Sequence, residues 1–145
     1  MILYLDTSAL VKLYAEEEGS ELVRQGVRAS ALIATSLMSY AEMRSALARK
    51  SRSREISRAV FAKCKKEFDR DWLRLHRLPV DEPLVRKAGE LAEEHALRAL
   101  DALHLATADS LQTALRDAVT FACFDGTLNR AAEARGLTVL PQRQV

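Results

Sequence analysis

The chain has 145 residues, of which 48% are hydrophobic and 29% are charged, and its formal net charge is +2. This length suits one domain with its own hydrophobic core, and the composition excludes a disordered, fibrous or repeat protein. A net charge this small does not by itself require a polyanionic partner. We therefore predict a single domain over residues 1–145.

The cysteines and the N-terminus indicate where the protein works. Cys64 and Cys123 lack the spacing of metal ligands, which is typical of reduced packing residues in a cytosolic protein. The first apolar run ends at Asp6, too early for a signal peptide or a membrane span. The expected location is cytoplasmic, with no membrane association.

The first apolar run, Ile2 to Leu5, has no alternation and is typical of a buried parallel strand. Asp6 follows this strand directly. In open α/β sheets, ligands bind beyond the carboxyl ends of the strands. Asp6 is therefore expected at the edge of the sheet where a functional site forms.

Two short helices and a second strand are expected next. Residues 32–35 form the strand, and because no two-residue hairpin turn separates the apolar runs, the order favours a parallel sheet. Hydroxyl residues are the expected N-caps of the two helices: Thr7 or Ser8 for residues 9–15, and Ser20 for residues 21–28.

Ser39 and Glu42 have the spacing of a capping box at the start of a long helical segment. Taken alone, Glu42 is better explained by this box than by chemistry, and it can serve both only if the box is open. The following segment, Arg44 to Arg70, is rich in basic residues and forms either a solvated helix face or a ridge that contacts phosphates. The candidate RNA contacts are Arg44, Arg52, Arg54 and Arg58.

Residues 73–80 contain alternating apolar residues and form a third candidate strand. Asp81 is the expected N-cap of the amphipathic helix that follows, with Pro83 in its first turn. His95, near the end of this helix, is interpreted as a helix-edge residue rather than a ligand.

The segment 100–108 is rich in alanine and apolar on nearly every side, which predicts a buried helix. A buried carboxylate needs hydrogen bonds, a cation or a proton, so Asp101 requires an explanation. An N-cap role for Asp101 is disfavoured because Ala99 and Leu100 look like continuing helix. His104, one turn later, is interpreted as a packing or supporting residue rather than a catalytic base.

Another apolar strand, residues 119–124, precedes Asp125, and a last helix and strand follow, with Gly136 between them. The stretch 124–128, Phe-Asp-Gly-Thr-Leu, resembles the phosphatase motif of haloacid-dehalogenase-like enzymes. Those enzymes need a nucleophilic aspartate two positions earlier, where this chain has Cys123, and their motif normally opens the domain. We therefore reject this interpretation.

Four acids remain, on four separate elements, two of them at strand ends. Carboxylates gathered in one pocket repel one another and raise their own pKa values unless a cation lies among them. All-oxygen ligands select Mg²⁺ or Mn²⁺ over Zn²⁺, and such a site suits hydrolysis of phosphodiester bonds. The four acids are Asp6, Glu42, Asp101 and Asp125.

The order and setting of these acids resemble the PIN domain, and more closely the VapC-type toxins of toxin–antitoxin pairs. Each short motif is weak alone, but their order and spacing are specific, and the likeness covers nearly the whole chain. The matching stretches are Asp6-Thr7-Ser8 with Leu10 to Tyr14, Glu18-Gly19-Ser20, Ser39 to Glu42, Leu100 to Ala108, and Phe124-Asp125 with the helix before Gly136.

This resemblance implies a three-layer α/β/α fold around a parallel sheet of four to five strands. It also implies a homodimer and a Mg²⁺- or Mn²⁺-dependent endoribonuclease whose four acids bind metal and catalyse cleavage. A hydroxyl of Thr7 or Ser8 would support metal or phosphate binding. Many relatives carry a further acid where this chain has Thr127 and Asn129, which leaves Asn129 as a weaker oxygen donor. The implied partners are RNA and a small antitoxin protein.

Three alternatives stay open. The first is a nuclease of the same fold that works in RNA processing without an antitoxin. The second is a non-catalytic binding module, which would have no need to keep Asp101 in a buried helix. A Mg²⁺-dependent phosphatase is the weakest alternative.

Overall fold

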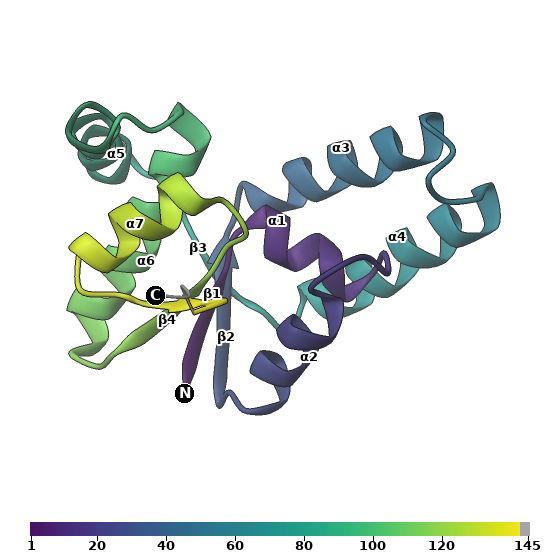
Figure 1. Cartoon of the computed structure of the whole chain (residues 1–145), viewed down its shortest axis with the longest axis horizontal. Coiled ribbons are helices and arrows are strands. Elements are labelled where there is room, and N and C mark those ends of the chain that lie inside the picture. Colours follow the sequence, from purple (N-terminus) through teal and green to yellow (C-terminus); the bar gives the residue numbers. More distant parts are fainter. Residues whose placement is uncertain (143–145) are drawn as a thin grey trace.

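The computed structural model describes residues 1–142 and has a parallel β-sheet at its centre (Figure 1). Within these residues the sheet has five strands in the order β3-β2-β1-β4-β5, and every neighbouring pair is parallel. The predicted parallel sheet is thus confirmed. The strands are β1 (Ile2–Leu5), β2 (Leu32–Ser36), β3 (His76–Leu78), β4 (Val119–Ala122) and β5 (Thr138–Leu140).

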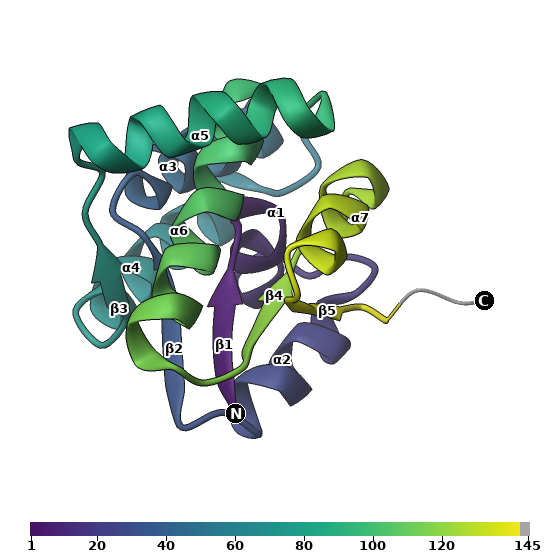
Figure 2. The ribbon, with the colours of Figure 1, turned by 90° about the vertical axis from the view of Figure 1, so that its left-hand side faces the viewer.

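Helices cover both faces of this sheet, which gives the predicted three-layer α/β/α fold (Figures 1 and 2). One face carries α1 (Thr7–Leu10), the 3₁₀ helix η1 (Val11–Leu13), α2 (Ser20–Arg28), α3 (Ser39–Arg52) and α4 (Arg58–Trp72). The other face carries α5 (Glu82–His95), α6 (Ala99–Leu115) and α7 (Gly126–Ala134).

Strand β1 is apolar without alternation because it is buried on both faces. Leu3 and Leu5 pack with Phe68 in the core beneath α1 to α4. Tyr4 points to the opposite core, where its ring stacks on Phe121 with centroids 5.6 Å apart. A strand between two helical layers therefore needs apolar side chains at every position.

The strand order creates a switch point between β1 and β4. From β1 the chain moves to β2 and β3 on one side, and then returns to β4 and β5 on the other side. The backbone N–H of Asp6 donates to the carbonyl of Ala122 at 3.1 Å, so β1 and β4 end together. Open α/β sheets bind ligands beyond the carboxyl ends of strands at such a point. Asp6 and Asp125 flank it.

The start of α1 differs from the prediction. Neither Thr7 nor Ser8 is its N-cap, because the carboxylate of Asp6 accepts the cap hydrogen bond from the Ala9 N–H at 3.0 Å. A carboxylate is a stronger acceptor for this N–H than a neutral hydroxyl. The Ser8 hydroxyl instead donates to Asp6 at 2.7 Å.

The start of α2 also differs. Gly19, rather than Ser20, is the N-cap, at a φ of +92° that favours glycine. A Cβ at Gly19 would lie 2.7 Å from the ring of Phe124, so only glycine fits there. The Ser20 hydroxyl accepts a hydrogen bond from the Glu17 N–H at 3.0 Å.

Two further elements test the sequence prediction. Helix α4 continues to Trp72, so the strand expected over residues 73–80 is shortened to His76–Leu78. Asp81 caps α5 as predicted, by accepting from the Leu84 N–H at 3.0 Å.

Both cysteines are buried and unpaired, as predicted. Among residues 1–142, no helix has the length and apolar character needed to cross a membrane.

Candidate active site

A cleft of about 1000 Å³ lies at the carboxyl end of β1. Its walls come from the turn after β1, from α1 and η1, from α3 and from the first turns of α6. Three of the four predicted acids, Asp6, Glu42 and Asp101, line this cleft, and Asp125 does not. Residues far apart in the sequence are thus brought together at the switch point of the sheet.

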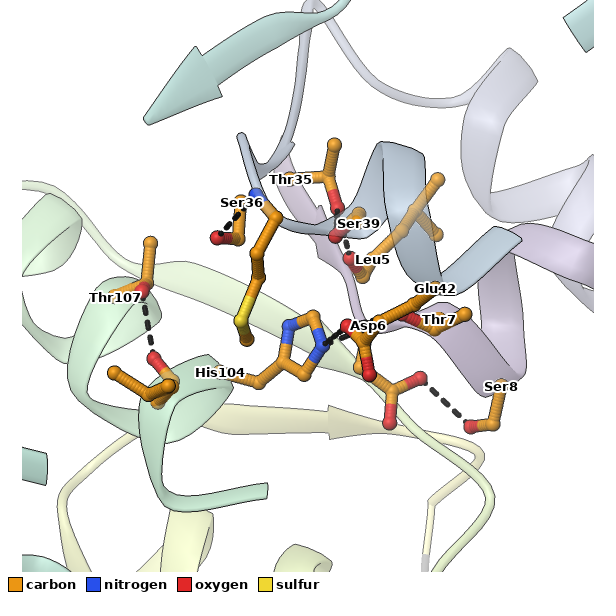
Figure 3. Close-up of polar contacts among 12 residues, drawn as sticks. Leu5, Asp6, Thr7, Ser8, Thr35, Ser36, Ser39, Glu42, His104 and Thr107 are labelled. Carbon is orange, nitrogen blue, oxygen red and sulfur yellow. Dashed lines mark hydrogen bonds and ion pairs between the residues drawn. The ribbon is translucent and has the colours of Figure 1, made fainter. Parts of the chain in front are cut away.

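Asp6 is held firmly at the base of the cleft. Its side chain is 4% exposed and accepts hydrogen bonds from the Ser8 hydroxyl and the Ala9 N–H (Figure 3). Burial raises the pKa of Asp6, and His104 and these hydrogen bonds oppose the shift only in part. The Ser8 hydroxyl also accepts from the Phe124 N–H at 3.2 Å, which ties this corner to the end of β4.

Glu42 does not form the capping box that its spacing suggested. Helix α3 begins after Met38 with no side-chain cap, and the Ser39 hydroxyl bonds to Thr35 instead. The Glu42 Oε1 atom accepts from Thr7 Oγ1 at 2.8 Å and lies 2.8 Å from Nε2 of His104 (Figure 3). The box is therefore open, and Glu42 faces the cleft.

The pKa of Glu42 lies below its usual range. Burial alone would raise it, but the interactions with His104 and the hydrogen bond from Thr7 outweigh burial. Glu42 therefore holds its negative charge in the cleft. The neighbouring Asp6 differs, because burial raises its pKa above the usual range.

Asp101 lies in the first turn of α6 rather than in the buried interior of a helix. Helix α6 begins at Ala99 with Arg98 as its N-cap, which confirms that Ala99 and Leu100 are helical and that Asp101 is not the N-cap. The centre of α6 is buried as predicted, whereas the Asp101 side chain is 22% exposed. Its carboxylate accepts a hydrogen bond from Arg98 Nε at 3.0 Å.

Asp125 caps α7, accepting from the Leu128 N–H at 3.0 Å, and its side chain is 41% exposed. Arg98 Nη2 lies 3.8 Å from the Asp125 carboxylate. Arg98 thus joins Asp101, in the cleft, to Asp125, at the cleft margin. Asn129 is buried behind this margin, where its amide N–H donates to the Cys123 carbonyl at 2.8 Å.

The amide oxygen of Asn129 is buried and has no hydrogen-bond partner among residues 1–142. Asn129 does not line the cleft. The supporting role expected of Asn129 as an oxygen donor therefore stays a prediction. By contrast, Thr7 and Ser8 both line the cleft, where each hydroxyl donates to an acid.

The donor set suits a hard divalent cation, because the acids offer only carboxylate oxygens. Nevertheless, no three His, Cys, Asp or Glu side chains within residues 1–142 converge closely enough to hold a metal ion. Asp6 and Glu42 each turn an oxygen toward protein donors, and Arg98 holds Asp101. The residues fit the cation in their chemistry, and their side chains would have to turn to surround it.

Basic side chains also line the cleft, among them Lys12, Arg49 and Lys50. Glu17 neutralises two of them, with Lys12 Nζ at 2.9 Å and Lys50 Nζ at 2.6 Å. Of the predicted RNA contacts, none lines the cleft. Arg52, Arg54 and Arg58 surround a separate hollow at the α3–α4 turn, and Arg44 lies 3.9 Å from Asp69.

Sequence reasoning missed Arg98, and it expected a packing or supporting role for His104 without identifying its partner. Arg98 carries no motif that marks it, although its position just before α6 places it beside the helix's first acid. His104 is 2% exposed and contacts Glu42, which is 62 residues away in the sequence. A pairing over that distance is visible only after the chain has folded.

Comparisons with known proteins agree on one fold and one family. The PIN domain family matches residues 3–134. Ribonuclease VapC45 of Mycobacterium tuberculosis is 32% identical over 141 residues, which cover 97% of this chain and 95% of that protein.

Two solved structures share the fold. FitAcB from Neisseria gonorrhoeae has a TM-score of 0.68 at 20% identity, covering 95% of this chain and 96% of that one. Mycobacterium tuberculosis VapC20, described as a sarcin–ricin loop cleaving toxin, has a TM-score of 0.66 at 17% identity, covering 89% of this chain and 94% of that one.

Proposed function

The chain belongs to the PIN-domain family, and from that premise we propose that it is an endoribonuclease that acts as the toxin of a toxin–antitoxin pair. One observation carries the chemistry: Asp6, Glu42 and Asp101 come from three separate elements and line one cleft at the switch point of the sheet. A relative named a ribonuclease, matched over nearly its whole length, supports RNA as the substrate.

We propose that cleavage depends on Mg²⁺ or Mn²⁺, in keeping with the family and with the all-oxygen donor set. Asp6, Glu42 and Asp101 would hold the cation, and Asp125 would contribute from the margin of the cleft. When bound, the cation would lower the pKa of water and neutralise charge on the phosphoryl oxygens. Arg98 would compete with the cation for Asp101, because its Nε donates to one oxygen of that carboxylate at 3.0 Å.

The protein's own groups prepare the cleft for this reaction. Ser8 and the start of α1 fix Asp6 at the end of β1. Thr7 and His104 hold one oxygen of Glu42. Lys12 and Lys50 would attract RNA phosphates, with Glu17 giving way to the incoming phosphate.

The predicted contacts at Arg44, Arg52, Arg54 and Arg58 remain part of the proposal as an outer phosphate-binding surface. The hollow that Arg52, Arg54 and Arg58 share at the α3–α4 turn supports that role. Long-range attraction by such charges steers RNA toward the protein, while the cleft residues position it.

Family membership supports further features of the proposal. They are a small antitoxin partner, a homodimer, a cytoplasmic location and one nuclease domain over the whole chain. The last of these agrees with a single sheet covered by helices on both faces. Size-exclusion chromatography with light scattering tests the dimer, and copurification with the product of a neighbouring gene tests the antitoxin.

The decisive assay follows end-labelled structured RNAs, including a sarcin–ricin loop, with purified protein in Mn²⁺ or in EDTA. We expect cleavage at discrete sites in Mn²⁺ and none in EDTA. Asp6→Asn should abolish cleavage. Asp117→Asn, which removes an exposed acid before β4 at the opposite edge of the sheet, should not.

Each alternative predicts a different result. RNA binding without cleavage by the wild type would indicate a non-catalytic module. Release of inorganic phosphate from a monoester would indicate a phosphatase. Cleavage by a protein that copurifies with no small partner would favour an RNA-processing nuclease.

A further inference from the structure

A buried chain of hydrogen bonds crosses the protein from the core to the cleft. Its first member is Tyr4 on β1, which is fully buried, and its hydroxyl lies 2.8 Å from Nδ1 of His104. The other nitrogen of the same ring, Nε2, lies 2.8 Å from Oε1 of Glu42. The imidazole of His104 therefore connects the interior of the sheet to an acid of the cleft.

The position of one proton in this chain follows from the distances. A carboxylate oxygen is an acceptor, and two acceptors 2.8 Å apart without a hydrogen between them would repel each other. Oε1 of Glu42 already accepts the hydrogen of the Thr7 hydroxyl at 2.8 Å, so it is the acceptor in its contact with Nε2 as well. His104 must therefore carry a proton on Nε2 and donate it to Glu42.

The ring of His104 has little freedom to turn away. It is 2% exposed, and the ring of Tyr4 packs edge-on against it with centroids 5.9 Å apart. Thr7 Oγ1 also donates to the same Glu42 oxygen at 2.8 Å. Two fixed donors thus determine where Oε1 of Glu42 lies.

This arrangement leaves the second oxygen of Glu42 free. Within residues 1–142, Oε2 makes no hydrogen bond, although Glu42 lines the cleft. A carboxylate with one oxygen held by protein donors and the other unoccupied is prepared to bind a ligand with the free oxygen. A mobile glutamate would instead have to lose side-chain freedom on binding.

We propose that His104 is a positioning residue: held by Tyr4, it donates from Nε2 to Glu42 and aims the free Glu42 oxygen at the cation. The role rests on the proposed function, since it is defined by the same cation site. This role differs from simple core packing. A packing residue would affect cation binding equally whether the Nδ1 or the Nε2 contact was lost, whereas a positioning residue needs the Nε2 contact.

Two amide substitutions separate the two nitrogens of the ring. In His104→Gln, the amide nitrogen can reach the position of Nε2 and donate to Glu42. In His104→Asn, the shorter amide reaches only the position of Nδ1, so the contact with Tyr4 can persist while the contact with Glu42 is lost. Both replacements are polar amides, which makes them matched controls for the loss of the ring.

The first measurement is Mn²⁺ affinity by calorimetry, at a temperature where urea unfolding shows that all three proteins are folded. Loss of a group that orients a metal ligand typically weakens metal binding about 10- to 100-fold. We expect that loss for His104→Asn and a near-normal affinity for His104→Gln. Equal affinities for the two variants, whether normal or reduced, would overturn the positioning role.

The second measurement locates the proton in metal-free wild-type protein by ¹⁵N NMR of the imidazole nitrogens. The chain has three histidines, so the signals that disappear in His104→Gln identify His104. We expect a proton on Nε2, and a ring protonated on Nδ1 alone would overturn the proposal.

Failure of the proposed function gives a different pattern. A wild type that binds Mn²⁺ and shows the Gln and Asn contrast, but cuts no RNA, would refute the nuclease and keep the positioning role. An active nuclease in which His104→Asn binds Mn²⁺ normally would refute the positioning role and keep the nuclease.

Discussion

Replacing Asp6 should separate its role in stability from its role in chemistry. Asp6 caps α1 through its hydrogen bond to the Ala9 N–H, and asparagine serves this position as well as aspartate does. Asp6→Asn keeps the cap and removes a buried charge, whereas Asp6→Ala removes both. Loss of an N-cap costs about 1 kcal/mol. We therefore expect the Ala variant to be about 1 kcal/mol less stable than the Asn variant.

The sign of the charge effect follows from the raised pKa of Asp6. A carboxyl group whose pKa is higher in the folded protein than in the unfolded chain favours folding less as the pH rises through that interval. At pH 7 the penalty for ionisation is present, so Asp6→Asn should be at least as stable as the wild type. Below the usual pH range for aspartate, the carboxyl group is protonated in both states and this advantage should disappear.

Urea unfolding of the three proteins at pH 7 and pH 3 tests these expectations, with Asp117→Asn as the exposed control. For a chain of this size, a difference of about 1 kcal/mol corresponds to about 3 °C in Tm. An Asn variant clearly less stable than the wild type at pH 7 would contradict a destabilising effect of the buried Asp6 charge. Ionised Asp6 would then be a structural charge rather than one kept for a ligand.

Three other predictions concern charged groups. Arg98→Ala should bind Mn²⁺ up to about fivefold more tightly by calorimetry, because the exposed Arg98 side chain makes only a weak ion pair with Asp101. Weaker binding would contradict competition between Arg98 and the cation. Asp109 on α6 is 10% exposed and pairs with Lys87 on α5 and Arg135 after α7. These two cations outweigh the effect of burial and lower the pKa of Asp109. Because the lowered pKa favours folding only while the carboxylate is ionised, Asp109→Ala should cost about 2 kcal/mol in urea unfolding at pH 7. That cost should shrink as the pH falls through the lowered pKa. A cost independent of pH would refute a stabilising role of the Asp109 charge. Replacing Lys12 and Lys50 with alanine should reduce the salt dependence of binding to single-stranded RNA by about 0.7 per lost phosphate contact, measured in EDTA; an unchanged slope would exclude these lysines from the RNA path.

The strands and the layer order could be predicted because they depend on local composition. An apolar run without alternation, such as Ile2 to Leu5, has few options other than a strand between two helical layers. Acids at the ends of such strands were correctly expected at the carboxyl edge of the sheet. The order of the acids along the chain also identified the family.

The errors arose where several local groups compete for one hydrogen bond. Asp6, rather than Thr7 or Ser8, is the N-cap of α1. Glu42 bonds to His104 and Thr7 instead of closing a capping box. These outcomes depend on burial and on partners far away in the sequence. For the same reason, the position of Arg98 between two acids could not be predicted from the sequence.

The most direct test of the account is calorimetric titration of Mn²⁺ into metal-stripped protein, with wild type, Asp6→Asn and Asp117→Asn compared side by side. We expect binding to the wild type and to Asp117→Asn, and loss of binding in Asp6→Asn. Equal binding by all three proteins, or no binding by any, would contradict a cation site at the end of β1.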